Sequence, residues 1–121
     1  MHARRETTQR TVLFVGRDLH EAERLRRLLP LRVFVSSSPA DGLAAARTAD
    51  VVLLEDRGWP ARDSEALAEL RELSASRKLA LILSRRHGEH GEQGGVQVVE
   101  RPYRIAEVVD AVRLALLRRR A

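Results

Sequence analysis

The sequence contains no cysteine, which excludes both a disulfide framework and a thiolate metal site. It also contains no uninterrupted apolar run of about eighteen residues, the length that a membrane-spanning helix requires. The N-terminal residues include no apolar stretch of the kind found in secretory signal peptides. These absences predict a cytoplasmic protein without membrane contact, and 121 residues suffice for a single domain with a buried core.

The excess positive charge lies at the two ends of the chain. Residues 1–10 carry three arginines and one glutamate, and residues 118–121 carry three arginines, so the ends account for the whole net charge of +5. A nucleic-acid-binding face would need basic residues clustered on the folded body. We therefore predict a basic N-terminal tail (1–10), a neutral domain (11–117) and a basic C-terminal end (118–121). A small nucleic-acid-associated protein acting through these Arg-rich ends is the alternative.

Strand-like and helix-like segments alternate along the chain. Strands are expected at residues 11–15, 31–35, 51–54, 79–83 and 96–99. Helices are expected to begin at Asp18, where Glu21 three residues later completes a capping box, at Ser38 and at Asp63 or Ser64. A last helix is expected to include residues 105–116. This alternation predicts an α/β fold with a doubly wound parallel sheet of five strands. The first, third and fourth strands are the most uniformly apolar and should be central, which matches the flavodoxin-like order 2-1-3-4-5.

One segment interrupts the alternation. Residues 85–95 contain four glycines and no apolar residue, so they cannot form an amphipathic helix. We predict that the fourth helix of the fold is missing or reduced to a turn. Two histidines in this segment, His87 and His90, have a spacing that metals tolerate, but no third ligand is near, which favours a solvated loop.

The chain is organised around the apolar run at residues 51–54. This run is followed at once by two adjacent carboxylates, Glu55 and Asp56, and then by a loop that contains Gly58 and Pro60. Four consecutive apolar residues are typical of a strand that is buried on both faces. Ligands of open parallel sheets bind beyond the carboxyl ends of such strands. Glu55 and Asp56 are therefore the first candidates for a functional site.

With these elements in place, the sequence resembles a response-regulator receiver domain, the phosphoryl-accepting module of two-component signalling. Asp56 is followed by Pro60, Asp63 and Ser64, much as the phosphoacceptor aspartate of this family is followed by a proline and an Asp-Gly pair. The resemblance therefore identifies Asp56 as the acceptor or its remnant. Glu55 stays as the alternative, because counting from the start of the strand favours it.

Two further motifs extend the resemblance over nearly the whole of residues 11–117. Ser84, at the end of the fourth strand, matches the switch Ser/Thr of the family. Arg101, Pro102 and Tyr103 look like its Lys-Pro-aromatic signature. The resemblance implies that Ser84 and Arg101 flank the acceptor and contact the phosphoryl group. It also makes Pro102 a candidate for a cis peptide bond.

The sequence departs from the family pattern where Mg²⁺ would bind. The acidic pair that holds the metal in receivers falls here on Gly16 and Arg17, and Asp18 comes one position too late and serves as a helix cap. We predict no resident metal or cofactor. Mg²⁺, held by Asp18 and Asp56, is the alternative if the protein is phosphorylated.

The lysine of the family signature is replaced by Arg101. A guanidinium group is a planar fork suited to pairing with a carboxylate, so we expect Arg101 to contact Glu55 or Asp56 directly. We also expect the structure to place guanidinium groups against both acids.

These features together resemble an atypical or pseudo-receiver. They predict a regulatory protein–protein interaction module in bacterial-type phosphorelay signal transduction that works without phosphorylation. Its partners would be signalling proteins, with homodimer formation left open and neither nucleic acid nor membrane expected. It would not be an enzyme beyond self-phosphorylation and self-dephosphorylation at Asp56. The alternative within the family is a functional receiver that a histidine kinase phosphorylates on Asp56 with Mg²⁺.

Overall fold

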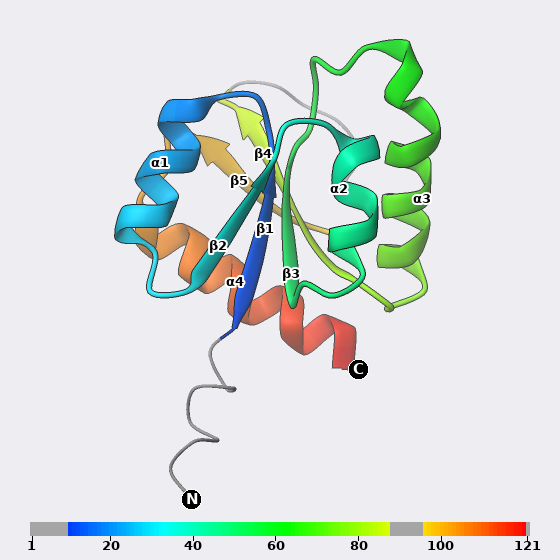
Figure 1. The fold of residues 1–121 in the computed structure, drawn as a ribbon. Helices are drawn as coiled ribbons and strands as arrows, with labels where there is room; N and C mark the ends of the chain where they lie inside the picture. The colour runs from blue at the N-terminus through cyan, green and yellow to red at the C-terminus, as the bar shows by residue number, and fades with distance from the viewer. Residues whose placement is uncertain (1–9, 88–95, 121) are drawn as a thin grey trace, which may run out of the picture.

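The structure is a computed structural model, and it describes residues 10–87 and 96–120 (Figure 1). Five strands and four α-helices make up this part of the chain. The strands are β1 (Thr11–Val15), β2 (Arg32–Ser36), β3 (Val51–Glu55), β4 (Ala80–Arg86) and β5 (Gln97–Arg101). The helices are α1 (Leu19–Leu28), α2 (Pro39–Ala46), α3 (Ser64–Ala75) and α4 (Ile105–Arg120), with a 3₁₀ turn, η2 (Ala61–Asp63), before α3.

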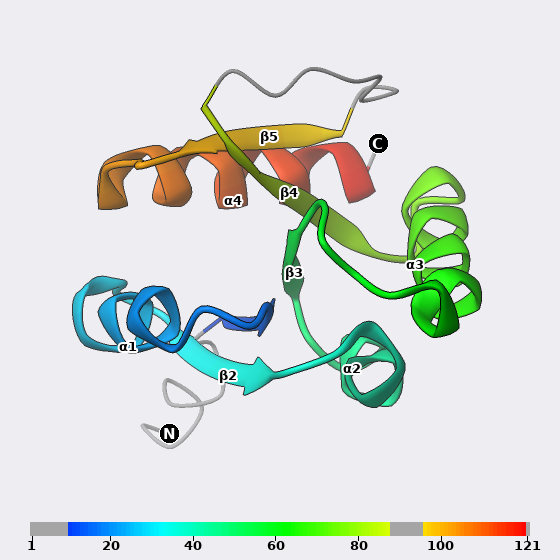
Figure 2. The ribbon, with the colours of Figure 1, turned by 90° about the horizontal axis from the view of Figure 1, so that it is seen from above.

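The strands form one parallel sheet in the order β2-β1-β3-β4-β5. Helices α1 and α4 cover one face of the sheet, and α2 and α3 cover the other (Figure 2). The predicted α/β fold and its flavodoxin-like strand order are therefore confirmed. The three strands predicted to be central, β1, β3 and β4, are central, and their residues are almost all buried, whereas most residues of the edge strand β2 are not.

Successive residues of β3 point to opposite faces of the sheet. Val51 and Leu53 pack into the core under α1 and α4, whereas Val52 and Leu54 pack into the core under α2 and α3. All four side chains are fully buried. Continuing this alternation places Glu55 on the side of α1 and α4 at the carboxyl edge of the sheet.

Two helices begin at the caps that the sequence predicted. The Asp18 side chain accepts hydrogen bonds from the backbone N–H groups of His20 and Glu21 at the start of α1. The Ser38 side chain accepts from the Asp41 N–H at the start of α2. Each cap satisfies N–H groups that lack a partner inside the helix. At α3 the expected cap is weaker, since Asp63 is the N-cap residue but makes no side-chain capping bond.

Strand β4 is longer than predicted. Its pairing with β5 continues to the partners Arg85–Glu100 and Arg86–Arg101, so the loop does not begin at Arg85. The extension is stabilised by the Arg85 side chain, which is buried in an ion pair with Asp56. The predicted absence of a fourth helix concerns residues 88–95, including His90, and these lie outside the described residues.

Helix α4 continues to Arg120, so residues 118–120 of the basic C-terminal end are helical. Arg119 donates from Nη1 to the backbone oxygen of Asp50 at 3.4 Å, and Arg10 forms an ion pair with the Asp50 side chain at 3.6 Å. Arg10 and Arg119, one from each basic end, thus both contact Asp50, which directly precedes β3. None of the described helices is long and apolar enough to cross a membrane.

Candidate functional site

The predicted site residues gather at the carboxyl edge of the sheet. Glu55 ends β3 and pairs in register with Ser84 of β4, while Arg101 ends β5. Gly16 and Arg17 follow β1 directly. Because the strands are parallel, their carboxyl ends bring these residues to the same edge, as the sequence predicted.

Glu55 is held by contacts from three segments. Its Oε1 accepts a hydrogen bond from the backbone N–H of Arg17 at 2.9 Å, and its Oε2 lies 3.6 Å from Nη1 of Arg101. Its backbone oxygen accepts a hydrogen bond from Nε1 of Trp59 at 2.7 Å. The Glu55 carboxylate therefore lies in the middle of the edge, between the loop after β1 and the end of β5.

Asp56 points elsewhere, although it is the next residue. One carboxylate oxygen lies 2.7 Å from Nε of Arg85, and the other lies 2.9 Å from Nη2 of Arg71 on α3. The Asp56 and Arg85 side chains are only 5% and 4% exposed. The expected pairing of guanidinium groups with both acids is confirmed, and Arg101 pairs with Glu55, while Asp56 takes two different arginines.

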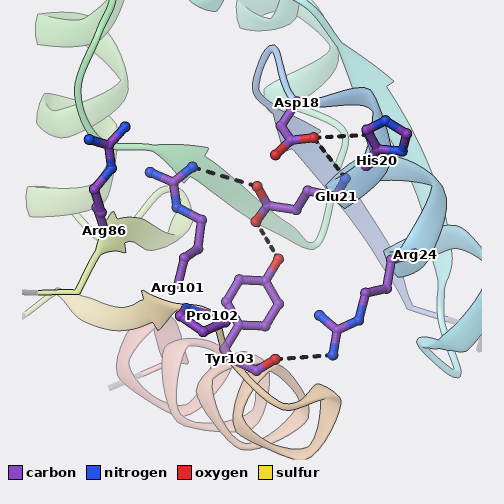
Figure 3. A pocket seen from close by; sticks show the side chains of 8 residues that line it. All are labelled: Asp18, His20, Glu21, Arg24, Arg86, Arg101, Pro102 and Tyr103. Carbon is purple, nitrogen blue, oxygen red and sulfur yellow. Dashed lines mark hydrogen bonds and ion pairs between the residues drawn. The ribbon is translucent and has the colours of Figure 1, made fainter.

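Glu21 of α1 joins the site, which the sequence analysis missed. Its Oε2 accepts hydrogen bonds from the Tyr103 hydroxyl and, at 3.4 Å, from the Ser84 hydroxyl. Its Oε1 lies 3.8 Å from Nη1 of Arg101 (Figure 3). The signal that could have found it is helical spacing, because Glu21 precedes the buried Leu25 by one helical turn and shares its face. The capping role of this sequence position hid that signal.

Burial governs the protonation of this cluster. Burial raises the pKa of Glu21 above its ordinary value of 4.5, and the hydrogen bond from Tyr103 and the charge of Arg101 oppose that rise only in part. Burial also raises the pKa of Tyr103, and its hydrogen bond to Glu21 acts in the same direction. Tyr103 therefore stays protonated at neutral pH and remains a donor.

Gly16 and Arg17, which stand where the acidic pair was expected, make contacts of another kind. A Cβ atom at Gly16 would lie 2.5 Å from a ring carbon of Phe14 and 3.0 Å from Oε1 of Glu55, so any larger residue requires a shift. The Arg17 guanidinium donates to the backbone oxygen of Gly58 and lies 4.9 Å from the ring centre of Trp59. The space into which a side chain at Gly16 would extend is thus taken by the Phe14 ring.

These residues do not fit Mg²⁺, which requires about six oxygen ligands in near-octahedral geometry. Glu21 and Glu55 are both paired with the guanidinium of Arg101, and Asp18 faces two backbone N–H groups. No group of three or more metal-ligating side chains occurs within residues 10–87 and 96–120. The Arg101–Pro102 peptide bond is cis.

A cavity of about 500 Å³ opens beside this cluster, between α1 and the turn from β5 to α4 (Figure 3). Arg101 and Glu21 belong to both the cluster and the cavity. The complete lining is Asp18, His20, Glu21, Arg24, Arg86, Arg101, Pro102 and Tyr103.

No model of a known protein family matches the sequence, and no curated protein matches it. The fold does match solved structures. The fold is similar to a response regulator receiver protein from Sinorhizobium medicae, with a TM-score of 0.72 at 17% identity over 93% of this chain and 98% of that one. It is also similar to the signal receiver domain of an HD domain-containing protein from Pseudomonas fluorescens, with a TM-score of 0.71 at 21% identity over 93% and 98%. At these identities the similarity establishes the receiver-domain fold alone.

Proposed function

We propose that the chain is an atypical receiver domain that acts as a regulatory protein–protein interaction module, and that it works without phosphorylation. The observation that carries the proposal is the sharing of one guanidinium, that of Arg101, between Glu55 and Glu21. A cation held by the protein itself thus faces both carboxylates at the edge where a receiver would carry out phosphoryl transfer. Gly16 and Arg17 supply no carboxylate to oppose it.

In this proposal Glu55, and not Asp56, takes the acceptor position, although spacing along the sequence favours Asp56. The support is the position of Glu55 between the Arg17 N–H, Ser84 and Arg101. A glutamate paired with a cation there resembles a permanently charged acceptor. Asp56 becomes a structural residue, because both of its oxygens are engaged by Arg71 and Arg85.

If the domain is not phosphorylated, it can transmit a signal only by contact with a protein partner. Helix α4 exposes three large apolar side chains that such a partner or a second copy of the chain can cover, namely Val109, Leu114 and Leu117. Their exposed fractions are 36–55%. Either partner fits this proposal, which is independent of the oligomeric state.

The test is incubation with acetyl phosphate and Mg²⁺, followed by intact-mass measurement. The proposal predicts no gain of a phosphoryl group by the natural protein. A well-characterised receiver treated in parallel should gain one, which controls for the reagent. A gain that disappears in Asp56→Ala would establish a functional receiver instead, whereas a gain that disappears only in Glu55→Ala would place the acceptor at Glu55. Both outcomes overturn phosphorylation independence.

A further inference from the structure

Strand β2 is the last strand of the sheet on one side, and its only neighbour in the sheet is β1 (Figure 2). The backbone oxygen of Ser36 accepts a hydrogen bond from the Gly16 N–H at 3.1 Å, so the backbone groups of Ser36 face β1. Successive residues of a strand direct these groups to opposite sides. The N–H and C=O groups of Val33 and Val35 therefore face the outer edge, where a further strand can bind them.

The side chains of β2 do not protect this outer edge. Phe34 and Val35 are 45% and 37% exposed. Exposed edge strands are commonly protected by lysine, by proline or by a bulge. Strand β2 contains neither lysine nor proline, and its register with β1 is continuous. Its one charged residue is Arg32, at its start, so the edge is suited to pairing with another strand.

A groove of about 430 Å³ lies beside this strand, on the face of the sheet that α2 covers. Phe34 and Ser36 line it on the strand side. Asp41, Ala45 and Thr48 line it on α2, where their spacing places them on one helical face. Because these side chains are short, the exposed Phe34 ring borders open space rather than a packed helix.

We infer that a second copy of the chain pairs with β2 in antiparallel orientation, so that two sheets join into one across a two-fold axis. An antiparallel strand at the edge of an otherwise parallel sheet is a common arrangement. With Phe34 on the axis, Val33 of each copy lies opposite Val35 of the other. These are the residues whose backbone groups face outward, so each such pair exchanges two hydrogen bonds. The two Phe34 side chains then meet across the axis, beside the two grooves.

The same arrangement is complementary in charge. It places Arg32 of one copy opposite Ser36 of the other. Asp41 lies at the Ser36 end of the groove, since a Cβ atom at the neighbouring Gly42 would be 3.2 Å from Cβ of Ser36. Arg32 and Asp41 are exposed, and neither forms an ion pair with another described residue. The two-fold axis brings each Arg32 to the Asp41 of the other copy, which favours a second copy over an unrelated extended segment.

The first experiment is sedimentation velocity of the full chain over a series of concentrations. The mass should rise with concentration from that of one chain, 13.6 kDa, towards twice that value. Phe34→Lys places two like charges opposite each other on the axis and should weaken association about tenfold or more. The matched control is Leu114→Lys, which changes a residue of α4 with a similar exposed fraction, 43%, and should leave association unchanged. Circular dichroism should confirm that both variants are folded.

The second experiment tests the charge pair by exchange. Arg32→Glu and Asp41→Arg should each weaken self-association about tenfold or more, because each puts like charges together at both ends of the interface. An equimolar mixture of these two variants should associate as the natural protein does, since the mixed dimer has opposite charges at both ends.

Three results would overturn the inference. A chain that stays monomeric at every concentration would leave the β2 edge to a segment of another protein. Association that survives Phe34→Lys but is lost in Leu114→Lys would place the interface on α4. A mixture of Arg32→Glu and Asp41→Arg that associates no better than either variant alone would exclude the antiparallel register. The inference concerns assembly and does not rest on the proposed function, so none of these results alters the mass test of phosphorylation.

Discussion

Two carboxylate–arginine clusters lie on opposite sides of the end of β3, one at Glu55 and the other at Asp56. In the Asp56 cluster two arginines lie 2.7 and 2.9 Å from the carboxylate oxygens. In the Glu55 cluster one arginine is shared between two glutamates at 3.6 and 3.8 Å. Oε1 of Glu21 and Nε of Arg101 are buried there without a hydrogen-bond partner in the described structure. The first cluster satisfies its charges closely, whereas the second keeps unsatisfied hydrogen-bonding groups of the kind that functional sites carry.

The largest expected effect belongs to the Asp56 cluster. Asp56→Ala should lower the free energy of unfolding by about 3–5 kcal/mol, because it removes the buried carboxylate that pairs with Arg85 and Arg71. Urea denaturation measures this change. The matched control is Glu69→Ala, which breaks the exposed pair with Arg47 and should cost at most about 1 kcal/mol. If Asp56→Ala costs no more than the control, Asp56 does not have the structural role that we assign to it.

Gly16→Ala tests whether the space beside Gly16 is already occupied by the Phe14 ring. The new Cβ would lie 2.5 Å from the Phe14 ring, so we expect a loss of about 1–3 kcal/mol in unfolding free energy. Phe14→Leu should relieve part of that clash. The double variant should therefore cost less than the sum of the two single changes by at least about 0.5 kcal/mol. Strictly additive losses would show that the Phe14 ring does not occupy this space.

Glu21→Gln tests the Glu55 cluster through pH. The pKa of Glu21 is raised by burial, so the stability that this group contributes is fully present below its ordinary value of 4.5 and is lost as pH rises through the raised value. The Gln variant cannot ionise. It should therefore gain stability relative to the natural protein between pH values below 4.5 and neutral pH. Thermal denaturation across that range measures the difference, and a constant difference would contradict the burial-driven shift.

The strand order could be predicted from the sequence because strands that are buried on both faces consist almost entirely of apolar residues. The apolar runs that contain Val51 and Ile82 could only be central strands. The pairing of Arg101 with Glu55 was also predictable, since it follows from parallel topology and the chemistry of guanidinium. The length of β4 was not, because Arg85 and Arg86 are polar residues whose place in a strand depends on tertiary partners.

The roles of individual acids were harder to predict. Spacing to Pro60 favoured Asp56, whereas the alternation through Val51 and Leu53 places Glu55 on the side of Arg101. That alternation was available in the sequence but could be used only once the last residue of the strand was known. Glu21 was missed because a local capping role seemed to account for it, and its contact with Tyr103 spans most of the chain.

The central claim is that Arg101, and not a metal ion, faces Glu55. Trp59 reports on this most directly, because it is the only tryptophan and its indole N–H donates to the backbone oxygen of Glu55 at 2.7 Å. Tryptophan fluorescence should therefore be followed during titration with Mg²⁺. The account predicts no saturable change up to millimolar Mg²⁺. A saturable change that is lost in Glu55→Gln or Asp56→Asn would show a metal site at this edge and contradict the account.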